Sequence, residues 1–171
     1  MAKTKITAAE YFKAINMIYY FMLGGQILLG AMGIYMVKSG FLEVENDLLY
    51  DVMLIVVSLY FVIGMTGSYL YFKKRLAKTA EMKNFLEKTA HYRGSLVVQY
   101  AMVEGIALFA IVGFMFTGST MLLAILVVTI VYFIMLKPSR EKMASELNLT
   151  PAEVSLIRNP DSAISEFEAT Y

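Results

Sequence analysis

The sequence predicts an all-α fold: a polytopic membrane protein in which four transmembrane helices form a bundle. The chain of 171 residues is 58% hydrophobic and only 17% charged, whereas soluble domains average about 45–50% apolar and about 25% charged residues. The apolar residues gather in four long runs, and basic residues alternate between the connections. The length suffices for one domain.

Four runs are long enough to cross a bilayer, which takes roughly 20 mostly apolar residues in a helix. They cover residues 14–37, 48–72, 95–116 and 121–136, and the last is sufficient if it is hardly tilted. The first run is too long for a signal peptide and has no small-residue cleavage site behind it, so we expect it to be retained. A transmembrane domain over 1–137 is therefore expected, followed by a short cytoplasmic helical tail over 138–171.

The basic residues predict the orientation, because Lys and Arg are enriched in the cytoplasmic loops of membrane proteins. The N-terminal segment, the connection 73–93 and the start of the tail are basic. The first loop is acidic, with Glu43 and Glu45, and the loop 117–120 is uncharged. We therefore expect both termini and the connection 73–93 on the cytoplasmic side.

The basic connection has no Gly or Pro over 73–88. This composition predicts that the second span continues as a helix beyond the lipid headgroups. We expect the chain to break near residues 91–94, where Gly94 follows Arg93.

The tail carries two helix-start signals. Ser139 is expected to cap a helix over 140–147. The sequence Thr-Pro-Ala-Glu at 150–153 combines a cap residue, a Pro at the first helical position and an acid at the third, which predicts a helix to about Arg158. The last eleven residues are polar and are expected to be loose.

Glu104 is the strongest candidate functional residue, because it is the one acid well inside a span. A carboxylate at that depth costs a few kcal/mol, so it must face protein or water or carry a proton. Gln26 lies at a similar depth in the first span, and both are flanked by small residues that allow close helix approach. We therefore expect the first and third spans to pack together, with the Gln26 side chain donating a hydrogen bond to Glu104.

Two interpretations of Glu104 stay open: a reversible proton or cation site, or a structural contact between helices. In the first, Tyr100, Gln99 and Tyr20 are candidates to line a polar route from the cytoplasm. In the second, both tyrosines simply pack, with their hydroxyls bonded locally.

A second candidate site lies at the cytoplasmic membrane interface. Four to eight Lys or Arg beside a span is the usual composition for binding anionic lipid, although membrane orientation alone also explains such a cluster. Because orientation accounts for the basic residues, we do not expect nucleic acid as a partner. The candidate headgroup residues are Lys73, Lys74, Arg75, His91 and Arg93.

The sequence shows no arrangement typical of an enzyme. It has no Cys and one His, which makes a zinc site or a bis-histidine haem site improbable. It contains no phosphate-binding glycine loop, HExxH or GxSxG motif. We therefore expect no catalytic residues, no metal and no cofactor.

The stretch 100–107, Tyr-Ala-Met-Val-Glu-Gly-Ile-Ala, resembles the carboxylate helix of rotary ATPase proteolipids. The resemblance implies an ion-binding role for Glu104. The chain departs from the proteolipid pattern in two ways: Glu104 lies on the first helix of its hairpin, and the hairpin loop 117–120 is expected outside the cell rather than in the cytoplasm.

More of the chain resembles an uncharacterised family of small four-span bacterial inner-membrane proteins. That resemblance implies the four-span fold in the bacterial inner (cytoplasmic) membrane and no known activity. It is carried by Leu23-Gly24-Gly25-Gln26, Tyr92-Arg93, Val103-Glu104-Gly105, Lys137-Pro138 and Leu147-Asn148-Leu149.

We therefore expect a small non-enzymatic integral membrane protein that is an accessory or structural subunit of a membrane complex, or a homo-oligomer. Its expected partners are the lipid bilayer, other membrane subunits or copies of itself, and anionic lipid as a further candidate. The alternative is a proton- or cation-coupled translocation unit that uses Glu104.

Overall fold

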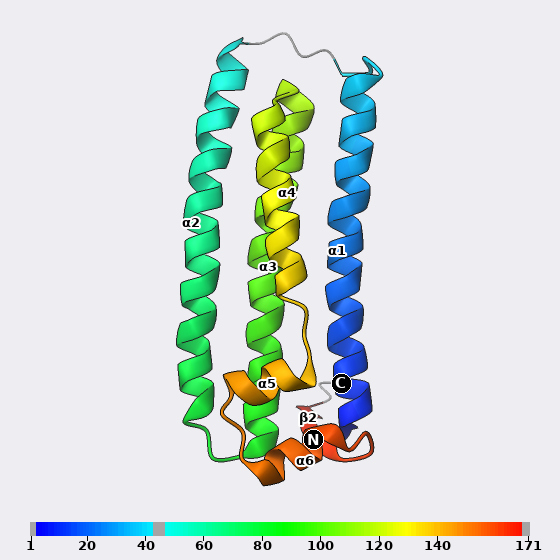
Figure 1. Cartoon of the computed structure of the whole chain (residues 1–171), viewed down its shortest axis with the longest axis vertical. Coiled ribbons are helices and arrows are strands. Elements are labelled where there is room, and N and C mark those ends of the chain that lie inside the picture. Colours follow the sequence, from blue (N-terminus) through cyan, green and yellow to red (C-terminus); the bar gives the residue numbers. More distant parts are fainter. Residues whose placement is uncertain (1–2, 43–46, 169–171) are drawn as a thin grey trace. The chain divides into compact units, whose positions relative to one another are not determined.

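The computed structural model describes residues 3–42 and 47–168, and the described chain is predominantly helical (Figure 1). Glu43 and Glu45, on which the orientation of the first loop depends, lie outside the described residues. The elements follow in the order β1 (Lys3–Thr7), α1 (Ala8–Lys38), α2 (Asp47–Ala80), α3 (Phe85–Thr117), α4 (Thr120–Met135), α5 (Arg140–Glu146), α6 (Pro151–Arg158) and β2 (Ala163–Glu168).

The helices include three that are long and apolar enough to cross a membrane: α1, α2 and α3. A fourth crossing is counted if α4 and α5, which meet at a bend of 85°, are taken as one broken span. These are the apolar helices that the sequence predicts, and their composition is that of a membrane protein.

The described chain forms two compact units. Unit 1 comprises Met1–Tyr19, Leu70–Gln99 and Lys137–Tyr171, and unit 2 comprises Tyr20–Tyr69 and Tyr100–Leu136. Unit 1 therefore combines segments from both ends of the sequence with the connection between α2 and α3. Unit 2 holds the most apolar parts of α1, α2 and α3 together with α4.

Glycines set the helix packing in unit 2. A Cβ added to Gly64 of α2 would lie 2.8 Å from Cδ1 of Ile106 on α3, and one added to Gly113 of α3 would lie 2.9 Å from Cδ1 of Leu122 on α4. On α1, a Cβ added to Gly33 would approach Ile111 of α3 at 3.6 Å. The distances at Gly64 and Gly113 are too short for a side chain, so close helix approach there depends on the missing Cβ atoms, whereas the distance from Gly33 to Ile111 is an ordinary contact. Figure 1 shows α3 and α4 side by side.

The turn between α3 and α4 is as tight as expected. Gly118 has φ of 62°, a left-handed conformation that glycine adopts without steric cost. Its backbone N–H donates to the Phe114 carbonyl at 2.7 Å, and the Thr117 hydroxyl donates to the Gly113 carbonyl at 2.7 Å. Both bonds satisfy carbonyls at the end of α3 that would otherwise lack a partner.

The break between α2 and α3 lies at residues 81–84, so the prediction of a break near 91–94 was wrong. His91 and Gly94 lie inside α3. Asn84 starts that helix: its side-chain oxygen accepts a hydrogen bond from the Leu86 N–H at 3.0 Å, and its amide donates to Glu87 at 3.4 Å. An Asn cap with an acid three residues later begins a new helix without Gly or Pro.

The two tail helices begin where the sequence predicts. The Ser139 side chain accepts from the Lys142 N–H at 3.0 Å at the start of α5. At α6, Thr150 and Glu153 form a reciprocal capping box with Pro151 in the first turn. These helices depend on local hydrogen bonds, which sequence alone specifies.

The C-terminal segment is not loose as expected, because β2 pairs with β1 in an antiparallel ribbon that joins the two ends of the described chain in unit 1 (Figure 1). Ile6 lies opposite Ser165, with an irregularity between Ile6 and Thr7. Ile164 is fully buried. The all-α prediction therefore omits one small sheet.

Candidate functional site

The two residues of the predicted intramembrane site lie in unit 2 on different helices. Gln26 on α1 is fully buried, and Glu104 on α3 is half-buried. Gln26 lies near the centre of the buried face of α1, which also presents Gly30 and Gly33 to the neighbouring helices.

The predicted hydrogen bond between Gln26 and Glu104 is not formed. Neither the side-chain nitrogen nor the side-chain oxygen of Gln26 has a hydrogen-bond partner. Glu104 makes no hydrogen bond or ion pair with any residue in the described ranges 3–42 and 47–168. A buried amide without partners costs about 1–3 kcal/mol, so Gln26 is the most costly polar group in the core of unit 2.

The two side chains nevertheless lie at the same level of the helix pair. Gly33 of α1 packs on Ile111 of α3, and each of these residues lies seven positions after Gln26 or Glu104. Residues seven apart on a helix share a face at a separation of two turns. Parallel helices in contact at Gly33 and Ile111 therefore bring the Gln26 and Glu104 positions toward each other two turns away.

The remaining residues of the predicted polar route have different surroundings. The Tyr100 hydroxyl is buried and donates to the Leu136 carbonyl at 3.1 Å, and its ring packs on Phe133 at 5.5 Å between centroids. Tyr20 is about half exposed on the outward side of α1. Gln99, in unit 1, is buried and its side-chain oxygen has no partner. A route through these side chains stays a prediction.

Two polar side chains that the sequence analysis did not select resemble Gln26 in being buried without a hydrogen-bond partner. The hydroxyls of Ser58 and Ser68 on α2 are buried and have no hydrogen-bond partner in the structure. Ser68 belongs to a small-residue patch with Gly64 and Gly67. Small polar residues in such a patch are typical of helix contacts in membranes, and this signal is present in the sequence.

At the predicted lipid interface, the structure brings Arg75 of α2 close to the start of α3 in unit 1. The Arg75 Nε donates to the Ser95 hydroxyl at 3.4 Å, and its guanidinium lies 5.9 Å from the Tyr71 ring centroid. His91 Nδ1 is 2.5 Å from the Thr79 hydroxyl. Thr79 and Ser95, which the sequence analysis did not select, therefore fix the positions of Arg75 and His91.

Of the other predicted headgroup residues, Arg93 and Lys73 lie on other helix faces than the cluster, and Lys74 lies beside it. His91 and Arg93 are two positions apart on α3, which places them on nearly opposite faces of the helix. Lys73 likewise lies two positions before Arg75 on α2. Lys74 shares a face with Lys78 one turn later, on the flank of Arg75. The cluster therefore consists of Arg75, His91 and Lys78, with Lys74 beside it.

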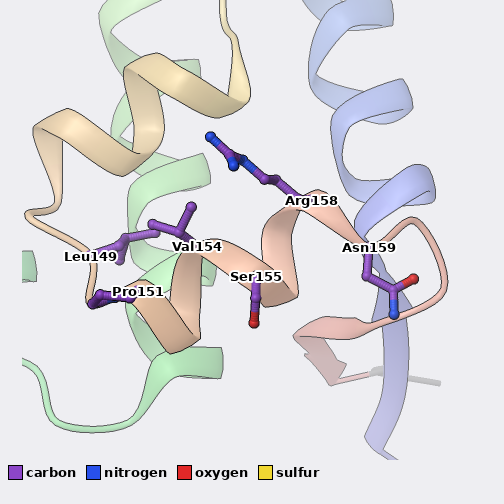
Figure 2. Close-up of a pocket in the computed structure, with 6 residues that line it drawn as sticks. All are labelled: Leu149, Pro151, Val154, Ser155, Arg158 and Asn159. Atoms are coloured by element: carbon purple, nitrogen blue, oxygen red, sulfur yellow. The ribbon is translucent and has the colours of Figure 1, made fainter.

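A surface groove of about 660 Å³ runs along α6 in unit 1. Figure 2 shows that the Val154 and Arg158 side chains leave one side of α6, whereas Ser155 points away on another. The Ser155 hydroxyl is already used, donating to the Ala152 carbonyl at 2.6 Å. The Arg158 and Asn159 side chains leave the helix end in different directions (Figure 2), so the polar groups of the groove do not converge in the way that orients a small molecule.

Within residues 3–42 and 47–168, no group of three or more His, Cys, Asp or Glu side chains is placed to hold a metal ion. The intramembrane pair of Gln26 and Glu104 and the basic cluster around Arg75 are thus the two candidate sites. No family model, no curated protein and no solved structure matches this chain.

Proposed function

We propose that this protein is a small non-enzymatic, four-span protein of the bacterial inner membrane with both termini in the cytoplasm. Its function is association: it is an accessory subunit of a membrane complex or a homo-oligomer. Two observations support the proposal. One is the apolar composition of α1, α2 and α3, and the other is an exposed surface on α1.

That surface is the outer stripe of α1, a row of exposed residues at alternating spacings of four and three. The five spacings average 3.6 residues, the period of an α-helix, so the row follows one face of α1 along its length. The outer stripe comprises Met17, Phe21, Gly24, Leu28, Ala31 and Tyr35.

Two small residues interrupt the large side chains of the outer stripe. Gly24 has no atom within 4 Å of the position its Cβ would take, and Ala31 follows seven residues later on the same face. Small residues between bulky neighbours create a notch that allows a second helix to approach closely, whereas lipid chains need no such notch. The outer stripe is therefore suited to another transmembrane helix.

Disulfide cross-linking tests this proposal, because the chain has no Cys and any introduced thiol is unique. We expect Gly24→Cys and Ala31→Cys to cross-link in oxidised native membranes. A homo-oligomer gives a band at twice 19.2 kDa, and a hetero-complex carrying its own thiol gives another defined mass. The matched control is Leu59→Cys on the exposed side of α2. Cross-linking of the stripe variants no stronger than that of Leu59→Cys would contradict the proposal.

A second candidate function is a proton- or cation-coupled translocation unit. It is favoured by the buried amide of Gln26, whose two polar atoms lack partners at the level of Glu104. A cation or a water chain between these side chains would supply the missing contacts.

Carbodiimide labelling separates the two functions, since the reagent attacks a protonated carboxyl group. In the translocation function, Glu104 is labelled in a pH-dependent manner, sodium protects it, and Glu104→Gln abolishes ion movement in proteoliposomes. In the association function, Glu104→Gln leaves cross-linking through Ala31→Cys unchanged.

A further inference from the structure

Arg75 and Lys78, near the end of α2, place two positive charges beside His91 of α3. The charges of both Arg75 and Lys78 act on the His91 ring. Neither Arg75 nor Lys78 forms an ion pair with a carboxylate anywhere in residues 3–42 and 47–168. Lys88, in the same unit, is instead paired with Glu153 at 3.5 Å. Lys88 therefore has a carboxylate partner within unit 1, whereas Arg75 and Lys78 have none among the described residues.

Arg75 is held in place while its terminal nitrogens stay unused. Its Nε donates to the Ser95 hydroxyl, which itself donates to the His91 carbonyl at 2.8 Å. The Tyr71 ring lies beside the guanidinium. Within the described part of the chain, neither terminal nitrogen of Arg75 has a hydrogen-bond partner. An oriented guanidinium fork of this kind matches two oxygens of a phosphate or carboxylate.

The position of the cluster along α2 indicates where the anion comes from. Exposed apolar side chains continue along α2 to Tyr69 and Leu70, and exposed lysines begin at Lys73. Arg75 therefore lies just beyond the apolar stretch, at the level that lipid phosphates occupy when a helix spans a bilayer.

We propose that Arg75, Lys78 and His91 form a binding site for the phosphate group of an anionic phospholipid. The terminal nitrogens of Arg75 donate to two phosphate oxygens, and the Lys78 ammonium adds charge from the next turn. His91 lines the α3 side of the site, with Nδ1 held by Thr79 so that the opposite edge of the ring is available. The inference does not depend on the outer stripe of α1, so the two proposals fail independently.

The experiment measures binding of phosphatidylglycerol to the full-length protein, with phosphatidylcholine as the uncharged reference. We expect Arg75→Gln and Lys78→Gln each to weaken phosphatidylglycerol binding about fivefold, since one basic residue near an anionic surface contributes about 1 kcal/mol. Lys83→Gln is the matched control, because it removes the same charge from the same connection outside the cluster. Equal loss in Lys83→Gln and Lys78→Gln would show diffuse attraction and overturn the proposal.

Arg75→Lys distinguishes a built site from a patch of charge. It keeps the charge and loses the planar fork, so we expect weaker binding than in the unaltered protein. If Arg75→Lys unfolds at the same temperature in detergent and still binds phosphatidylglycerol as the unaltered protein does, the proposed site is overturned. Because this variant keeps the charge, it also tests whether misfolding causes the loss of binding in Arg75→Gln.

A second experiment uses inorganic phosphate, which has the phosphate oxygens of the lipid headgroup without the rest of the lipid. We expect millimolar inorganic phosphate neither to displace phosphatidylglycerol nor to raise the unfolding temperature of lipid-free protein. If inorganic phosphate displaced phosphatidylglycerol from the unaltered protein but not from Arg75→Lys, the site would be assigned to a soluble phosphate. That result would overturn the lipid assignment.

Discussion

Polar side chains are used differently in the two units. In unit 1 they link segments that are distant in the sequence: the Tyr11 hydroxyl donates to the Thr89 carbonyl at 2.8 Å, and Tyr92 donates to Glu146 at 2.6 Å. In unit 2, Tyr100 donates to the distant Leu136 carbonyl at 3.1 Å, but Thr129 donates to the Ile125 carbonyl of its own helix at 2.8 Å, and Gln26 has no partner.

The difference indicates the solvent in which each unit is built. Unit 1 joins its segments by side-chain hydrogen bonds and an ion pair, as water-soluble domains do, with the Gln99 side-chain oxygen as its one buried polar side-chain atom without a partner among the described residues. Unit 2 depends on glycine contacts and apolar packing, with polar atoms of Gln26, Ser58 and Ser68 left over. Packing of that kind is typical of helices that associate in lipid, where apolar burial alone supplies little driving force.

Removing a large core side chain tests this contrast and has the largest expected effect. Ile157 in unit 1 and Leu122 in unit 2 are both fully enclosed. Ile157→Ala should cost about 2–5 kcal/mol, because it loses transfer from water as well as packing. Leu122→Ala should cost less, since lipid is as apolar as the core. Thermal unfolding of both variants in one detergent checks this, and equal losses would contradict the assignment of different solvents.

Filling a glycine contact in unit 2 should have the next largest effect. Gly64→Leu places atoms where Ile106 already lies, so we expect a loss of about 1–3 kcal/mol from overpacking. Gly24→Leu is the control, because nothing lies within 4 Å of its Cβ position. It should leave the unfolding temperature of the isolated chain unchanged or slightly higher. A similar loss in both variants would show that helix contact at Gly64 is unimportant.

Acidification should weaken unit 1 through Glu153. Burial raises the pKa of this carboxyl, but hydrogen bonds from Thr150 and the nearby Lys88 ammonium outweigh burial and leave the pKa below its ordinary value of 4.5. The folded state therefore keeps the charge to lower pH than the unfolded chain. The resulting stability is present above about pH 4.5 and is lost as pH falls through the folded pKa.

The Glu153→Gln variant makes this dependence measurable. We expect a loss of about 1–2 kcal/mol at neutral pH and a flatter acid limb in thermal unfolding. Glu81→Gln, at an exposed position just after α2, is the control and should keep the full pH dependence. An unchanged acid limb in Glu153→Gln would assign the acid sensitivity to another group.

Replacing Gln26 should have the smallest effect on stability, and its sign is informative. Gln26→Leu removes two buried polar atoms without partners, so we expect the unfolding free energy to rise by about 1 kcal/mol. A drop instead would show that the amide has a partner in the membrane, such as water, an ion or Glu104. That result would favour the translocation function.

Local signals in the sequence predicted local structure well. Ser139 and Thr150 start their helices through hydrogen bonds within one turn. The break before α3 was misplaced because the prediction looked for Gly and Pro, whereas Asn84 and Glu87 carry the start signal.

Long-range structure was harder to predict from the sequence. The pairing of Ile6 with Ser165 joins segments at opposite ends of the chain, and no local pattern specifies such a contact. The matching positions of Gln26 and Glu104 along their helices could be predicted, because they follow from helix rise alone. The hydrogen bond expected between them requires a particular side-chain geometry, which sequence does not determine.

The ribbon of β1 and β2 has a consequence for biosynthesis. A ribosome makes Lys3–Thr7 before Ala163–Glu168, so the ribbon cannot close until the residues between the two strands have been translated. Residues 20–136, which contain all of unit 2, are synthesised before that point. Membrane insertion of the nascent helices can therefore precede completion of unit 1, and a ribosome stalled before β2 would hold unit 1 open after unit 2 has been made.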